Sequence, residues 1–106
     1  MILRQIAHAR SGDKGNTANI AVIAYDMRHY QHIARHLTVE RVARHFGSIC
    51  KGTVTRYDLP KIGAFNFVLT EALSGGVVRS LALDSHGKSL SSALLGIEIP
   101  APHDGG

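Results

Sequence analysis

The stretch His8–Ala24, HARSGDKGNTANIAVIA, places a polar run that contains two glycines directly before a continuous apolar run. The apolar part, Ile20–Ala24, predicts an interior strand, because strands buried on both faces consist of unbroken apolar residues. The segment Ile2–Ala7 alternates weakly and predicts a strand on the other side of the polar run. We therefore interpret the polar run as a loop that joins two strands.

This loop is longer and richer in functional groups than a chain connection requires, because hairpins usually close with about two to five residues. Gly12 and Gly15 permit tight turns, and the polar side chains supply cations, a carboxylate, amides and a hydroxyl. These groups indicate an anion-binding loop formed by Arg10, Ser11, Asp13, Lys14, Asn16 and Asn19. The alternative is a polar surface connection whose side chains satisfy one another, since such residues are common in loops.

Three segments carry a resemblance to a known family: HARSGDKGNTANIAVIA, LTVERVARHF and LPKIGAFNFVLTEALSGGVVRSLALDSHGKSLSSALLGIEIP. They resemble the AtuA-like ferredoxin-fold family, which occurs as the C-terminal domain of acyclic terpene utilisation proteins and as short free-standing chains. The resemblance implies a single ferredoxin-like domain over residues 1–100. It also implies a role in acyl-CoA, terpenoid or branched-chain acid catabolism. Residues 101–106 are expected to form a frayed tail.

The rest of the chain mixes helical and strand-like patterns. From Asp26 the apolar spacing becomes helical, with Met27, Tyr30, Ala34 and Leu37 on one face. Thr38 predicts the N-cap of a second helix that ends at Gly47. Further strands are expected at residues 53–58, 64–72, 77–83 and 97–99, with a short helix from Ser89. Without a repeated βαβ unit, this mixture predicts an α+β two-layer sandwich of helices on one face of a mostly antiparallel sheet.

The length, composition and net charge of the chain restrict its domain count and the classes of partner that it can bind. A chain of 106 residues that is 44% hydrophobic can bury one core but leaves no room for a second domain. No apolar stretch reaches the roughly 20 residues of a membrane helix, and the N-terminus lacks a long apolar block, so a cytoplasmic protein without a membrane partner is expected. The net charge of +4 favours anionic partners such as coenzyme A phosphates, nucleic acid or an acidic subunit.

The single Cys50 is expected to be a buried, inert thiol.

Two further residues are candidates for ligand binding. The Asn66 amide lies between Phe65 and Phe67, so it must be hydrogen-bonded or must face a polar site on the other face of the sheet. Arg79 follows two glycines and offers a forked donor for a carboxylate or phosphate. A salt bridge from Arg79 to Asp13 would explain that arginine equally well.

Three histidines and two phenylalanines resemble parts of metal and RNA sites, but their surroundings disfavour both functions. His29, His32 and His36 share a helical face, as some metal ligands do, but they lie beside arginines and lack a local carboxylate. They are expected to be solvated and to titrate near pH 6.5, and no metal or other cofactor is expected. Phe65 and Phe67 loosely imitate the aromatic strand of RNA-recognition modules, but the core requires them, which disfavours nucleic acid as a partner.

Three functions therefore remain open. The first is a small subunit or accessory domain for an AtuA-type large chain, with self-association as a further option and an anionic acyl-CoA ligand. The second is an enzyme that acts on acyl-CoA or carboxylates, in which Lys14 positions the substrate, Asp13 transfers a proton and Ser11 stabilises an oxyanion. The third is an RNA-binding module. Apolar strands with little polar alternation favour the first, because one sheet face then needs a partner.

Overall fold

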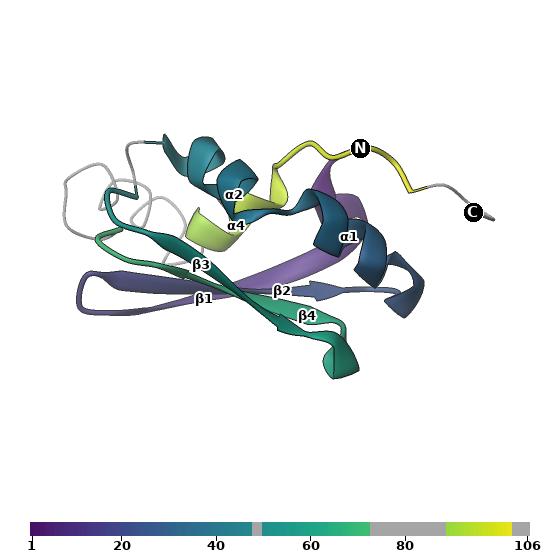
Figure 1. Cartoon of the computed structure of the whole chain (residues 1–106), viewed down its shortest axis with the longest axis horizontal. Coiled ribbons are helices and arrows are strands. Elements are labelled where there is room, and N and C mark those ends of the chain that lie inside the picture. The colour runs from purple at the N-terminus through teal and green to yellow at the C-terminus, as the bar shows by residue number, and fades with distance from the viewer. Residues whose placement is uncertain (48–49, 73–88, 103–106) are drawn as a thin grey trace.

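A four-stranded antiparallel sheet forms one layer of the protein (Figure 1). The computed structural model describes residues 1–47, 50–72 and 89–102. The strands lie side by side in the order β1-β2-β4-β3, and all their pairings are antiparallel. Their bounds are β1 Ala7–Lys14, β2 Thr17–Ala24, β3 Val54–Leu59 and β4 Ala64–Leu69.

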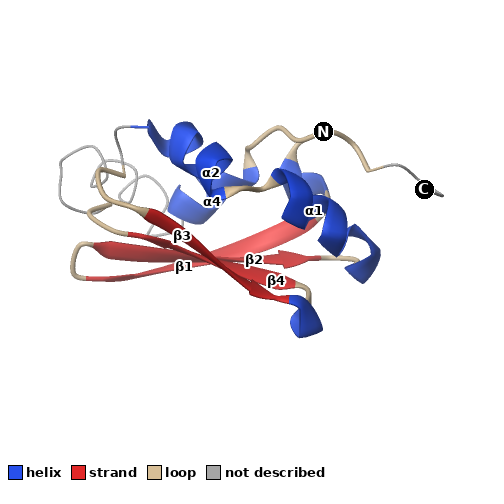
Figure 2. Ribbon diagram, viewed as in Figure 1, coloured by secondary structure: helices blue, strands red, loops and turns tan. Residues whose placement is uncertain are grey.

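The α-helices of the described residues lie on one face of this sheet, as Figure 2 shows. The Thr38 hydroxyl accepts a hydrogen bond from the Arg41 amide at 3.1 Å, and Gly47 follows the last helical residue with a φ of 56°. The predicted start and end of the second helix are therefore confirmed. The bounds are α1 Tyr30–His36, α2 Val39–Phe46 and α4 Ser89–Leu95, with short 3-10 helices η1 Leu3–Gln5, η2 Met27–His29 and η4 Pro60–Ile62. This architecture confirms the α+β ferredoxin-like sandwich.

The hydrophobic core lies between the helices and the sheet. Ile20 and Val22 of β2 and the two phenyl rings Phe65 and Phe67 of β4 are fully buried there. Side chains alternate between the faces of a strand, so the intervening residues of β2 lie on the other face, where they are half-buried or exposed. The prediction that Ile20–Ala24 is buried on both faces is therefore wrong for the described residues.

The polar run does not form a loop. β1 and β2 pair continuously from Ala7↔Ala24 to Lys14↔Thr17. Gly15 and Asn16 alone make the turn, and Gly15 has a φ of 63°. Two-residue hairpin turns need a positive φ at a central position, and glycine adopts it without strain. The expected loop is thus corrected to a β-hairpin.

The N-terminal segment also differs from its prediction. Leu3 and Ile6 are both buried three residues apart, a spacing that suits the 3-10 helix η1 better than an alternating strand. Ile2 makes an isolated bridge with Glu98, so the expected last strand is reduced to this contact. The expected strand at residues 77–83 and the end of the tail lie outside the described residues. Within the described part of the chain, no helix is both long enough and apolar enough to span a bilayer.

Candidate functional site

The face of the sheet opposite the α-helices is not covered by them, and we call it the open face (Figure 2). The strand register defines which side chains it carries. Because residues alternate along each strand, the open face consists of His8, Arg10, Gly12 and Lys14 from β1, Thr17, Asn19, Ala21 and Ile23 from β2, Ala64, Asn66 and Val68 from β4, and Thr55, Tyr57 and Leu59 from β3.

A row of polar side chains crosses the middle of the open face. In the register, Arg10 lies opposite Ala21, Ala21 opposite Asn66, and Asn66 opposite Tyr57. Of the two alternatives for Asn66, a hydrogen-bonded amide or an amide on the other face of the sheet, the register corresponds to the second, and its side chain is half-buried. Among the described residues, neither the Arg10 guanidinium nor the Asn66 amide has a hydrogen-bond partner. The row therefore holds donors that the described part of the chain does not use.

Gly12 makes room for a second amide on this face. Asn19 lies opposite Gly12, and a Cβ at that glycine would lie 3.0 Å from Asn19 Oδ1. A side chain at position 12 would push the amide away, so glycine lets Asn19 lie across β1 between Arg10 and Lys14. The hairpin thus turns part of the predicted loop into one flat polar surface.

The structure brings only half of the predicted site residues to this surface. Arg10, Lys14, Asn19 and Asn66 share the open face, and Arg79 lies outside the described residues. Ser11 and Asp13 point to the helix side of the sheet, because they alternate with Gly12 and Lys14 along β1, and Asn16 lies in the turn. The proposed catalytic set of Asp13, Lys14 and Ser11 therefore does not converge in this structure.

Sequence reasoning missed a group of exposed apolar side chains near one end of the sheet. Six large hydrophobic side chains are exposed among the described residues. Apart from Ile2, they belong to β3, to the turn between β3 and β4, or to the segment that follows β2. We call these five residues the apolar end: Tyr25, Met27, Tyr57, Leu59 and Ile62. The available signal was the unusual pair of aliphatic residues beside Pro60, in a turn that is ordinarily polar.

Local contacts hold this apolar end in place. The Tyr25 ring stacks on His8 of β1, with 5.1 Å between the ring centroids. Gly63 has a φ of 64°, and a Cβ there would lie 2.6 Å from the Met27 sulfur. Met27 thus lies directly over this turn glycine. Tyr25 and Met27 are therefore exposed but held by neighbouring residues.

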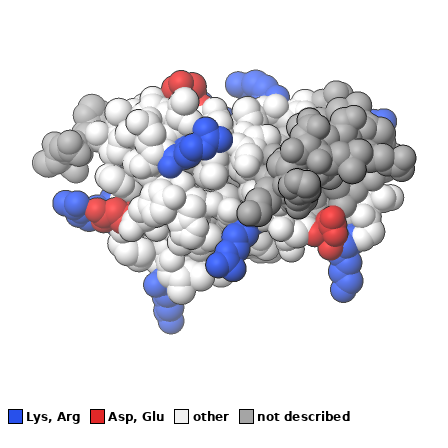
Figure 3. Space-filling view, turned by 180° about the vertical axis from the view of Figure 1, so that it is seen from behind, with Lys and Arg blue, Asp and Glu red and all other residues white. Residues whose placement is uncertain are grey.

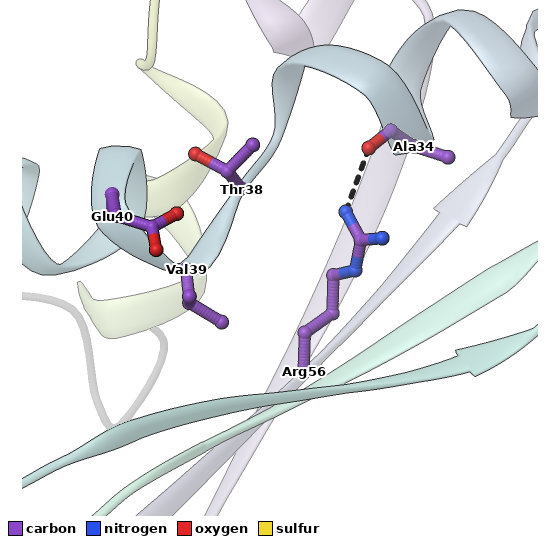
Figure 4. Close-up of a pocket in the computed structure, with 5 residues that line it drawn as sticks. All are labelled: Ala34, Thr38, Val39, Glu40 and Arg56. Carbon is purple, nitrogen blue, oxygen red and sulfur yellow. Dashed lines mark hydrogen bonds between the residues drawn. The ribbon is translucent and has the colours of Figure 1, made fainter.

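A hollow of about 310 Å³ lies on the helix side, between β3 and the junction of α1 and α2 (Figure 4). Arg56 reaches from β3 to the end of α1, where Nη1 donates to the carbonyls of Ala34 at 2.7 Å and Leu37 at 3.0 Å. Its Nε and Nη2 bind the Asp58 carboxylate at 2.8 and 3.1 Å, and its guanidinium lies 5.2 Å from the centre of the Phe65 ring. Arg56 is therefore a structural clamp. The lining residues are Ala34, Thr38, Val39, Glu40 and Arg56.

The histidines are less solvated than expected. His29, His32 and His36 are all half-buried, and His32 Nε2 pairs with the Pro100 carbonyl oxygen. Burial lowers the pKa of His36, and the neighbouring His32 lowers it further. The prediction that all three titrate near their ordinary value is therefore wrong for His36. Within the described ranges, no group of three or more potential metal ligands is present.

Cys50 is half-buried rather than fully buried, and this burial raises the pKa of its thiol. A raised pKa keeps the thiol protonated, which fits the inert role that its sequence context predicts.

Two observations disfavour RNA binding. Phe65 and Phe67 are fully buried against the helices, so they cannot stack on bases. Figure 3, which views the molecule from behind the view of Figure 1, shows the lysine and arginine side chains there as separate groups rather than as one continuous basic patch.

The fold and this surface define a class: an α+β ferredoxin-like domain whose α-helices, in the described part of the chain, cover one face of the sheet. The sequence model of the AtuA ferredoxin-like domain matches residues 1–100. The chain therefore belongs to the AtuA ferredoxin-like domain family. Comparison with curated proteins found no significant match, and comparison with solved structures found none either.

Proposed function

We propose that this chain is a small accessory subunit that docks through its open face onto an AtuA-type large chain. In this role it serves acyl-CoA, terpenoid or branched-chain acid catabolism and presents an anion-binding surface to an acyl ligand at the interface. Its family membership supports the choice of partner, because domains of this family also occur fused to such large chains. The observation that carries the proposal is the gathering of exposed hydrophobic side chains at the apolar end.

Exposed hydrophobic side chains that occur singly are ordinary, whereas a contiguous group of them marks an interaction surface. Tyr25 is 66% exposed and Ile62 is 65% exposed, so each can still bury most of its side chain against a partner. Tyrosine and methionine are also enriched at protein interfaces, and the apolar end contains both. The net charge of +4 favours an acidic partner surface around this contact.

The anion-binding part of the proposal rests on the polar half of the open face. Arg10 and Lys14 supply positive charge from β1, and the amides of Asn19 and Asn66 supply donors from β2 and β4. Hydrogen bonds from charged donors to anions are about twice as strong as those between neutral groups. An anion placed at the interface would therefore contact the accessory chain directly.

Co-purification with an AtuA-type large chain tests the docking role. The Leu59→Gln and Ile62→Gln double variant should lose the large chain, because it replaces apolar contact area at the apolar end with polar amides. Ile2→Gln is the matched control, since Ile2 is the exposed hydrophobic residue that lies outside this cluster. Equal recovery of the large chain with both variants would contradict docking at this end of the open face.

A further inference from the structure

The row of polar side chains that crosses the middle of the open face has a small residue, Ala21, between two large polar residues. Arg10, Ala21 and Asn66 are in register on three neighbouring strands. Strands are spaced about 4.8 Å apart, so the backbones at Arg10 and Asn66 are separated by about 10 Å, with a single methyl group between them. A small group of a ligand can rest on Ala21 and contact both flanking side chains.

Asn66 is an unusual residue for this position. It lies in β4, which has a paired strand on each side, although asparagine is depleted in strands. Its amide is half-buried and has no hydrogen-bond partner among the described residues. The amide group is not sealed from water, so its donors and its acceptor are open to a partner from outside the chain.

We propose that the Arg10–Ala21–Asn66 row binds the carboxylate of a small organic acid, whose apolar part extends toward the apolar end. This inference rests on the proposed function in one respect, namely that the open face binds an anion. It goes further by assigning the chemical group, the residues and the orientation of the ligand.

The charges of the row favour a carboxylate. A guanidinium donates two parallel hydrogen bonds to the two oxygens of a carboxylate, and an amide can donate to the same group from the opposite side. Arg10 is the single cation of the row, which matches a monoanion. Lys14 lies four residues further along β1, about 13 Å away along the strand, so its backbone is not beside the same ligand atoms.

The neighbouring row determines the direction of the apolar part. Towards the apolar end, the next residues in register are His8, Ile23, Ala64 and Leu59. His8 is stacked on Tyr25, so even this titratable side chain presents a ring surface. The open face therefore changes from polar to apolar within one strand repeat of about 7 Å, which fits a ligand with a charged head and an apolar chain.

An NMR titration of the isolated, ¹⁵N-labelled chain with hexanoate tests this inference. Saturable shifts should centre on the amides of Arg10, Ala21 and Asn66. Methyl hexanoate, which has the same chain without the charge, and inorganic phosphate should both bind at least about ten-fold more weakly, because they lack the charge or the apolar part.

Variants of the row and of its surroundings provide the comparison. Arg10→Gln should weaken hexanoate binding by about ten-fold to a hundred-fold, and Ala21→Leu should abolish it without changing the charge. Lys14→Gln removes the other cation of the open face and should weaken binding less than Arg10→Gln does. The matched control is Arg44→Gln, which removes one positive charge from α2 and should change the dissociation constant by less than about two-fold. Circular dichroism checks folding, and Arg10→Gln keeps the test decisive if Ala21→Leu misfolds, because Arg10 is exposed and makes no internal hydrogen bond among the described residues.

Several outcomes would overturn the inference. They are the absence of saturable hexanoate binding, equal binding of phosphate, and equal weakening by Arg10→Gln and Arg44→Gln. A dominant effect of Lys14→Gln would place the anion at the hairpin end instead, which contradicts this inference but leaves the open face as an anion-binding surface. The titration needs no large chain, so its failure is separate from any failure of the co-purification experiment.

Discussion

Two arginines on opposite faces of one sheet show how differently this protein uses the same side chain. Arg56 faces the helices, where its guanidinium binds two helix carbonyls and the Asp58 carboxylate. Arg10 faces away from them and has no hydrogen-bond partner among the described residues. One arginine holds the fold together, and the other is available to bind something else.

The same contrast extends to whole strands. On the helix side of β4, Phe65 and Phe67 fill the core, whereas Asn66 between them reaches the open face and has no hydrogen-bond partner among the described residues. Strand alternation therefore divides this sequence into a set of residues that stabilise and a set that can bind. Mutations at neighbouring positions should separate the two roles.

The largest expected effect distinguishes adjacent residues of β4. Phe67→Ala should reduce the free energy of unfolding by about 3–5 kcal/mol, because it leaves a cavity in the core. Val68→Ala on the open face should cost about 1 kcal/mol, since Val68 is half-buried. Urea denaturation of both variants measures the difference. Similar losses would mean that the open face is buried in the free chain.

The two arginines provide the next comparison. Arg56→Ala should lower the free energy of unfolding by about 2–3 kcal/mol, because the Ala34 and Leu37 carbonyls and the Phe65 ring lose their cationic partner. Arg10→Ala should change it by less than about 0.5 kcal/mol, as expected for a surface substitution. Thermal unfolding of both variants and of the unmodified protein measures this difference. A large loss of stability in Arg10→Ala would mean that Arg10 has a structural role.

Two turn glycines sharpen the comparison at the borders of the open face. Gly15 and Gly63 have φ values of 63° and 64°, but a Cβ meets the Met27 sulfur only at Gly63. Gly15→Ala should cost about 1 kcal/mol through backbone strain alone, and Gly63→Ala should cost about 1–2 kcal/mol because Met27 must also move. Unfolding experiments that rank Gly15→Ala as the more damaging variant would contradict the packing of Met27 over this turn.

The smallest expected effect is the pH dependence of the helix side. Burial lowers the pKa of His36, so the unfolded chain, with a pKa near 6.5, binds a proton before the folded protein does. Stability should therefore fall as the pH decreases from about 6.5 through the lower folded pKa. His36→Gln should flatten this part of the stability profile, measured by urea denaturation at several pH values. An unchanged slope would assign the dependence to another group.

Elements with strong local signals could be predicted from the sequence. Thr38 and Gly47 bound α2 as expected, and residues 89–95 are helical as expected, because caps and apolar spacing act over a few neighbouring residues. The extent of β1 could not be predicted. Its glycine and polar residues have poor strand propensity, and the pairing with β2 over eight residue pairs overrides that propensity.

The candidate site shows the same limit. Arg10, Lys14, Asn19 and Asn66 could be selected as ligand-binding residues from their chemistry, but their separation from Ser11 and Asp13 depends on strand alternation. The apolar end could not be predicted from the sequence, because Tyr25 and Ile62 belong to separate segments that come together only at one end of the folded sheet.

The sequence by itself determined the class of fold, the family and the bounds of α2, because apolar periodicity, capping residues and family motifs are local properties of the chain. The tertiary structure alone decided which polar residues share a surface. Hydrogen bonding between β1 and β2 and between β2 and β4 sets the register, and the register sets the face on which each side chain stands. A shift of one residue in either pairing would move Arg10 or Asn66 to the opposite side, which no local pattern records.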